Sequence, residues 1–349
     1  MCSQIFNLLR HIFNSDLLKK FKVEIKNNMS KVFVTRPIPE PGIGLLKEAG
    51  YEVEINSEDR VLLAEELKAK IAGVDAVLSL LTDKITSEVI SAAPNLKIIA
   101  NYAVGYDNID LDAAASKNIA VTNTPGVLTE AVAEHSLALI MAVARKIVEA
   151  DKYVRDGKYK QWEPELLVGE EMFGKTIGIV GMGRIGSYLA KICAAGLEMK
   201  VLYQDMMRND LMEGEFGIQK VELVQLVRES DIISIHTPLT SETKHLIDTE
   251  EFAMMKPGVI LINTSRGPVV SEVALIEALK SGKIAGAGID VFEFEPQISP
   301  ELMAAPNLVM TPHIASATTK ARQSMSEIAA KNIIAVLSGQ PAINPVVKK

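Results

Sequence analysis

The chain has 349 residues, 48% of them hydrophobic and 23% charged, with a formal net charge of −7. This length suggests two domains with separate cores, and the negative charge argues against a general nucleic-acid or membrane surface. No apolar run reaches the roughly 18 residues needed to span a bilayer. The two cysteines, Cys2 and Cys193, have neither metal-ligand nor disulfide spacing, so we expect no metal site and a reducing, cytoplasmic compartment.

Residues 1–28 mix apolar side chains with Asn, Lys and Arg. They lack the charged start, apolar centre and small-residue cleavage site of a secretory signal. Met29 directly precedes the first predicted strand. We therefore expect residues 1–28 to be a poorly ordered N-terminal extension, with Met29 as a candidate translation start.

From Ser30 onward, strand, loop and helix patterns alternate. Segments rich in apolar and β-branched residues predict strands at residues 31–35, 51–55, 75–80, 96–100 and 119–122. Helical spacing predicts short helices at 43–49 and 61–72 and a long helix over Leu128–Val154. Strands separated by helices form parallel sheets with both faces covered, so this pattern predicts an α/β fold.

The second half continues the same alternation. Further strands are predicted at residues 176–180, 200–204, 231–236, 259–263, 285–290 and 307–310. A last helix, over Thr318–Leu337, is stopped by Gly339 and Pro341.

A glycine-rich turn follows the strand at 176–180. Gly181, Gly183 and Gly186 have the spacing G-x-G-x-x-G, between a strand and the start of a helix. In such a unit the glycines allow a tight turn, close backbone approach to a pyrophosphate, and close packing of helix on strand. The free N–H groups of the helix attract the phosphates. The turn therefore predicts a dinucleotide site.

Asp205 ends the next predicted strand, about 20 residues beyond the last glycine. An acid at that spacing binds the ribose hydroxyls of NAD. A carboxylate there would repel the 2′-phosphate of NADP, so we expect NAD(H) as the cofactor, with NADP disfavoured. Arg208 lies nearby and would soften this preference.

Arg266, Glu295 and His313 follow separate strands of the same half. Open parallel sheets bind ligands beyond the carboxyl ends of their strands. Hydride transfer to a ketone leaves negative charge on oxygen, which a histidine can protonate. A nearby carboxylate favours the imidazolium, and an arginine fork binds the carboxylate of a 2-keto acid.

Each of these three residues also has a structural interpretation. Arg266 could form a surface salt bridge, Glu295 could be a solvated loop acid, and His313 could be a capping group. Glu293 competes with Glu295 for the same role. For His135, within the long predicted helix, we favour a structural role.

These motifs resemble the D-isomer-specific 2-hydroxyacid dehydrogenase family, and within it the chain is most similar to glyoxylate/hydroxypyruvate reductases. The matching segments are NYAVGYDNID at 101–110, NTPGVLTEAVAE at 123–134, GIVGMGRIG at 178–186, HTPL at 236–239, NTSRG at 263–267, DVFEFEP at 290–296 and TPHIAS at 311–316. The resemblance covers about residues 30–345.

The resemblance implies a role for each matching residue. His313 would be the general acid, Glu295 its partner, and Arg266 the residue that binds the substrate. Leu81 would shape the substrate pocket, and the backbone of Val104 and Gly105 would hold the substrate carboxylate. Cofactor contacts would come from Val104, Thr129, Gly181, Gly183, Arg184, Ile185, Gly186, Asp205, His236, Thr237, Pro238, Thr264, Ser265, Arg266, Asp290, His313, Ala315 and Ser316.

The resemblance also implies a chain path. A Rossmann NAD-binding domain, residues 125–313, would be inserted into a flavodoxin-like substrate domain formed by residues 29–124 and 314–349. Both domains would be doubly wound parallel sheets. The family forms homodimers through the long helix and arm after Pro125, and a tryptophan such as Trp162 would approach the neighbouring active site.

The expected function is NADH-dependent reduction of glyoxylate or hydroxypyruvate to the D-2-hydroxy acid, with a small 2-keto acid as the binding partner. Two alternatives stay open. One is a phosphoglycerate dehydrogenase, and the other is an NAD-sensing binding protein like the corepressors that share this fold.

Overall fold

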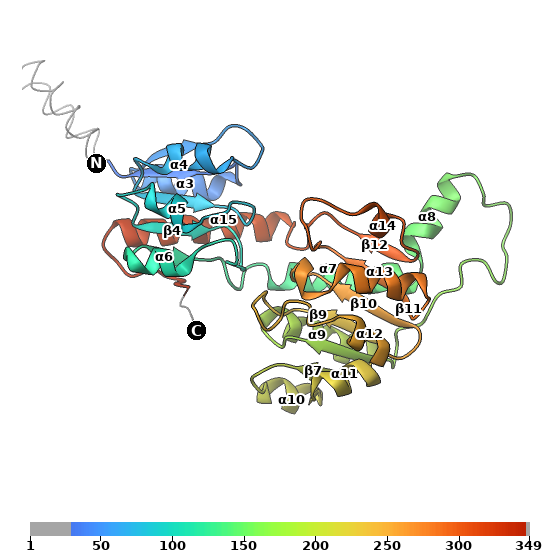
Figure 1. Ribbon diagram of the computed structural model, residues 1–349. Coiled ribbons are helices and arrows are strands. Elements are labelled where there is room, and N and C mark those ends of the chain that lie inside the picture. Colours follow the sequence, from blue (N-terminus) through green and yellow to red (C-terminus); the bar gives the residue numbers. More distant parts are fainter. Residues whose placement is uncertain (1–28, 347–349) are drawn as a thin grey trace, which may run out of the picture. The chain divides into compact units, whose positions relative to one another are not determined.

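The computed structural model describes residues 29–346 (Figure 1). The predictions for residues 1–28 lie outside the described residues. By its internal contacts the chain forms two compact units, the first up to Pro125 and again from Arg322, and the second from Gly126 to Ala321. Among residues 29–346, none of the helices has both the length and the hydrophobicity of a membrane span.

The first unit contains a five-stranded parallel sheet in the order β2-β1-β3-β4-β5. This is the order of flavodoxin-like doubly wound sheets. The strands are β1 (Lys31–Val34), β2 (Glu52–Ile55), β3 (Ala76–Ser79), β4 (Ile98–Asn101) and β5 (Ala120–Thr122). The helices are α3 (Glu40–Glu48), α4 (Ala64–Ile71), α5 (Ser87–Ser91), α6 (Leu111–Ser116) and most of α15 (Thr319–Leu337).

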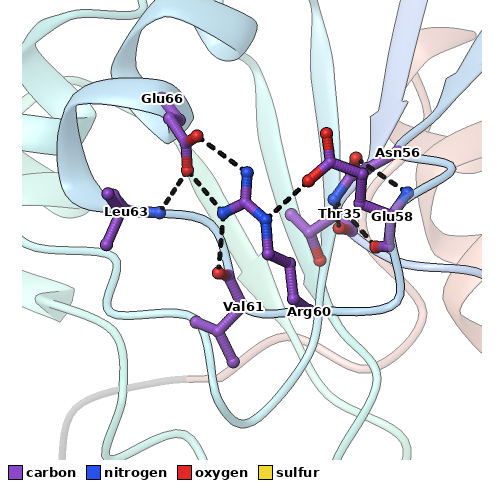
Figure 2. Close-up of polar contacts among 7 residues, drawn as sticks. All are labelled: Thr35, Asn56, Glu58, Arg60, Val61, Leu63 and Glu66. Atoms are coloured by element: carbon purple, nitrogen blue, oxygen red, sulfur yellow. Dashed lines mark hydrogen bonds and ion pairs between the residues drawn. The ribbon is translucent and has the colours of Figure 1, made fainter.

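Polar side chains tie down the loop between β2 and α4 of this unit. Figure 2 shows Arg60 between the carboxylates of Glu58 and Glu66, and Asn56 bound to nearby backbone groups. The Asn56 amide donates to the carbonyl oxygens of Thr35 (3.1 Å) and Glu58 (3.2 Å).

The second unit contains a seven-stranded parallel sheet in the order β12-β11-β10-β9-β6-β7-β8. Its strands are β6 (Thr176–Val180), β7 (Lys200–Gln204), β8 (Gln219–Lys220), β9 (Ile232–Ile235), β10 (Val259–Asn263), β11 (Ile284–Ile289) and β12 (Leu308–Met310). Its helices are α7 (Thr129–Ala144), α8 (Ile147–Arg155), α9 (Arg184–Leu197), α10 (Asp210–Phe216), α11 (Leu223–Glu229), α12 (Thr249–Met254), α13 (Glu272–Lys280) and α14 (Pro300–Met303).

Both faces of this second sheet are buried. Ile232 and Ile262 pack into the core formed with α7 and α9, whereas their chain neighbours Ile233 and Leu261 pack into the core formed with α11, α12 and α13. Successive strand residues point to opposite faces, so a strand covered on both sides must be apolar throughout. The α/β class and the two parallel sheets predicted from the sequence are confirmed.

The helical stretch predicted over Leu128–Val154 is present, but it is interrupted at Lys146. The segment forms two helices, α7 and α8, because Lys146 adopts a left-handed conformation with φ of 50°. The carbonyl oxygen of Ala144 accepts the N–H of Glu170 (2.8 Å) instead of continuing the helix. A Cβ on Gly169 would lie 2.2 Å from that oxygen, so only glycine permits this approach.

The last helix packs on the first unit. The Tyr102 hydroxyl donates to the carbonyl oxygen of Arg322 (2.7 Å), and the N–H of Gly42 donates to Ser326 Oγ (3.1 Å). The division between the units falls at Ala321/Arg322, later than the predicted change at Ile314. Residues 314 and 315 stay with the second unit because their N–H groups donate to the Asp290 carboxylate.

Candidate functional site

The glycine-rich turn lies between β6 and α9, at the point where the strand order of the second sheet reverses. Such switch points hold ligands in open α/β sheets. Gly181 has φ of 96°, and a Cβ there would lie 2.8 Å from the His236 carbonyl carbon and oxygen. A Cβ on Gly186 would lie 2.1 Å from the Gly181 carbonyl oxygen. These two glycines therefore allow close packing within the protein.

Gly183 differs from its two neighbours in the motif. A Cβ at this position meets no atom within 4 Å, and Gly183 precedes the first turn of α9, where N–H groups lack intrahelical partners. This face of the turn is open, as the approach of a pyrophosphate to the backbone requires. The turn therefore fits a dinucleotide.

Asp205, directly after β7, faces the same turn. Its carboxylate accepts the N–H of Met182 (2.7 Å) and the N–H of Met207 (3.0 Å). Arg208, which could have offered charge to a 2′-phosphate, instead forms ion pairs with Glu213 and Asp210. The acid predicted to bind ribose thus lies beside the glycine turn.

His236 follows β9 on the other side of the switch point, next to Thr237 and Pro238. Its Nε2 lies 2.8 Å from the Ser234 hydroxyl. Burial lowers the pKa of His236 to about 4, so this ring is neutral at physiological pH. Thr264, after β10, is buried with its hydroxyl 2.8 Å from that of Ser136 on α7.

Glu295 and His313 are brought together although 18 residues separate them. Glu295 Oε2 lies 3.0 Å from His313 Nδ1, and its other oxygen accepts the Phe292 N–H (2.9 Å). Burial by itself raises the pKa of Glu295, but the hydrogen bond and charge of His313, the Phe292 N–H and the charge of Arg266 outweigh it and lower the pKa. Glu295 is therefore ionised next to the histidine.

Glu293, the other candidate partner of His313, contacts different residues. Its carboxylate lies 2.7 Å from His245 Nε2 and accepts the N–H of Glu272 at the start of α13 (2.9 Å). Of the two acids, only Glu295 contacts His313 in this arrangement.

A buried network that the sequence did not indicate holds the backbone around His313. The fully buried Asp290 carboxylate accepts the Thr311 hydroxyl (2.6 Å) and the N–H groups of Ile314 (2.8 Å) and Ala315 (2.7 Å). His135 Nε2 lies 3.0 Å from the Thr311 hydroxyl. His313 itself has φ of 54°, and these bonds offset the cost of that left-handed conformation.

The predicted substrate residues Leu81, Val104 and Gly105 lie in the first unit. Leu81 follows β3, and the other two lie in the loop after β4. All three are partly exposed. Asn108 supports both loops, because its amide donates to the carbonyl oxygens of Leu80 (3.1 Å) and Asp83 (2.9 Å).

Comparison with known proteins connects this geometry to a family. The model of the D-isomer specific 2-hydroxyacid dehydrogenase NAD binding domain matches residues 137–315. A glyoxylate reductase of Thermococcus litoralis is 51% identical over 322 residues, covering 91% of this chain and 97% of that protein. The chain belongs to the D-isomer-specific 2-hydroxyacid dehydrogenase family. It is therefore an oxidoreductase with an NAD(P)-binding domain.

Other proteins are also similar to this chain. A glyoxylate reductase of Thermofilum pendens is 52% identical over 314 residues, covering 89% of this chain and 92% of that protein. A solved protein of Thermus thermophilus matches with a TM-score of 0.85 at 44% identity, covering 91% of this chain and all of that one. An NADPH-dependent glyoxylate/hydroxypyruvate reductase of Sinorhizobium meliloti, solved with NADP and malonate, has a TM-score of 0.81 at 31% identity, covering 92% and 97%.

Proposed function

We infer that this dehydrogenase reduces a small 2-keto acid, glyoxylate or hydroxypyruvate, to the D-2-hydroxy acid with NADH. The observation that carries the proposal is the 3.0 Å contact between His313 Nδ1 and the ionised Glu295. It lies in the unit that carries the glycine turn. The curated relatives named glyoxylate reductase support the substrate class.

The proposed mechanism follows from the residues of this chain. NADH, when bound, supplies the hydride. His313 keeps Nδ1 on Glu295, so its Nε2–H is the group that protonates the developing alkoxide. Glu295 stabilises the imidazolium before transfer, and Arg266 binds the substrate carboxylate and carbonyl.

The proposed preference for NADH over NADPH depends on Asp205, the residue predicted to bind the ribose. The carboxylate of Asp205 would meet the 2′-phosphate of NADP at short range, and like charges repel. Arg208 is paired with Glu213, so its charge does not compensate. We propose that NADPH supports a much lower kcat/KM than NADH.

We further propose that the protein is a cytoplasmic homodimer. Ile147 and Val154 on α8 are 55% and 59% exposed. Trp162, in the arm between α8 and β6 (residues 156–175), is 78% exposed. Figure 1 shows α8 and this arm extending from the rest of the second unit. A free, buried thiol at Cys193 fits a reducing compartment. Light scattering after size exclusion tests the dimer, and cell fractionation tests the location.

A substrate panel tests the function. The loss of NADH absorbance is followed with glyoxylate, hydroxypyruvate, pyruvate and phosphohydroxypyruvate, and the product configuration is determined. The highest kcat/KM is expected with glyoxylate or hydroxypyruvate and a D product where the product is chiral. A preference for phosphohydroxypyruvate would indicate a phosphoglycerate dehydrogenase, and no turnover of any of the four would favour an NAD-sensing role.

A further inference from the structure

Two peptide groups of the loop after β4 are held by asparagine side chains. Asn123 Nδ2 donates to the carbonyl oxygen of Val104 (2.7 Å), and Asn101 Nδ2 donates to that of Gly105 (2.8 Å). Asn123 follows β5 and Asn101 ends β4. Two successive carbonyl groups are therefore fixed by neighbouring strand ends.

Fixing a carbonyl also fixes the N–H of the same peptide. The two groups point in opposite directions across a planar trans peptide. Asn123 thus aims the Gly105 N–H away from itself, and Asn101 does the same for the Tyr106 N–H. Neither N–H has a hydrogen-bond partner in the part of the chain that the structure describes. A bound carbonyl also polarises its peptide, which makes the N–H a better donor.

The amide of Asn101 is itself held in one orientation. This side chain is fully buried, its Oδ1 accepts the Ser79 hydroxyl (3.1 Å), and its Nδ2 lies 3.1 Å from Asn108 Oδ1. A flipped amide would set oxygen against the Gly105 carbonyl. Next to it, the N–H of Thr124 donates to the carbonyl of Ala103 (2.9 Å), which orients the Val104 N–H in the same manner.

We propose that Asn123, assisted by Asn101, is a positioning residue that orients the backbone N–H groups of this loop toward the carboxylate of the substrate. The inference rests on the proposed function, because it takes a 2-keto acid carboxylate as the ligand of Gly105. Asn123 does not touch the substrate in this account. It acts through the peptide that joins Val104 to Gly105.

The sharpest test replaces the donor by an acceptor of the same shape. In Asn123→Asp, a carboxylate oxygen faces the Val104 carbonyl oxygen, so the peptide is no longer held in the binding orientation. We expect KM for glyoxylate to rise about 10-fold or more, with a much smaller change in kcat, because carboxylate binding is shared by ground and transition states. The Kd of NADH should change much less than KM, because the glycine turn and Asp205 lie in the second unit. Asn123→Ser provides a less perturbing second variant.

Asn56→Ala is the matched control. Asn56 also donates its amide to backbone carbonyls of the first unit (Figure 2), but it follows β2, the edge strand furthest in sheet order from β5. Its loss should lower Tm and leave KM unchanged, which separates a positioning effect from general destabilisation.

A binding measurement complements the kinetics. In the NADH-loaded wild type, oxamate should shift the amide resonance of Gly105, and this shift should be lost in Asn123→Asp. Turnover by the wild type with unchanged KM and an unchanged Gly105 shift in both Asn123 variants would overturn the inference and leave the proposed function intact. No turnover of any 2-keto acid by the wild type would instead overturn the proposed function, and the inference with it.

Discussion

The three glycines of the turn should respond differently to alanine. A Cβ on Gly186 would lie 2.1 Å from the Gly181 carbonyl oxygen and 3.1 Å from Ile179 Cγ2. Ordinary contacts lie near 3.5–4.0 Å, so backbone must move by about 1 Å or more. Overpacking of this kind costs about 3 kcal/mol, which corresponds to a fall in Tm of roughly 6–12 °C for a unit of this size. Gly181→Ala should be at least as damaging, because φ of 96° adds strain.

Gly183→Ala should behave in the opposite way. The added methyl group meets no protein atom, so Tm should stay within about 2 °C of the wild type. The methyl group does occupy the space that a pyrophosphate needs, and we expect the Kd of NADH to rise about 10-fold or more.

Differential scanning fluorimetry measures Tm, and quenching or enhancement of NADH fluorescence measures Kd. Gly196→Ala, near the end of the same helix and also free of contacts within 4 Å, is the control and should change neither the NADH affinity nor, except by slight stabilisation, Tm. If Gly183→Ala lost as much stability as Gly186→Ala and bound NADH normally, Gly183 would be a packing residue and not part of the pyrophosphate site.

Three further predictions concern single side chains. The lowered pKa of Glu295 means that its ionised form stabilises the fold. The stability lost in Glu295→Gln, measured by urea unfolding, should therefore shrink as the pH falls below about 5 and through the lowered pKa. Burial raises the pKa of the Cys193 thiol to about 12, so peptide mapping should find it unalkylated by iodoacetamide at pH 8 in the native protein and alkylated in denaturant. Asp205→Ser should increase the ratio of kcat/KM with NADPH to that with NADH by about 10-fold or more; an unchanged ratio would remove Asp205 from cofactor selection.

The strands could be predicted because burial on both sheet faces leaves a continuous apolar signal. β3, β4, β9 and β10 are buried at every position, and each matches a predicted segment within two residues at either end. The glycine turn could also be predicted from the sequence. Two of its positions require glycine because they pack against backbone, and the third faces open space.

The break between α7 and α8 had no local signal. Lys146 is not a residue that ends helices, and the left-handed turn there accompanies a contact made by residues 169 and 170, far along the chain. Tertiary contacts of this kind override helix periodicity.

Within the site, the sequence could name the residues but not their pairings. Glu293 and Glu295 are equivalent by spacing, and only the folded chain pairs one with His245 and the other with His313. The network under His313 was missed for the same reason. Asp290 was predicted as a cofactor contact, and no pattern in the sequence indicated that its carboxylate would hold residues 311–315.

In the proposed mechanism His313, held by Glu295, supplies the proton that completes hydride transfer. The most direct test is kcat for glyoxylate reduction by His313→Ala at saturating NADH, measured together with the Kd of NADH. We expect kcat to fall by about 10²–10⁴-fold in a variant that still folds and still binds NADH. A variant with normal kcat would show that His313 is not the proton donor.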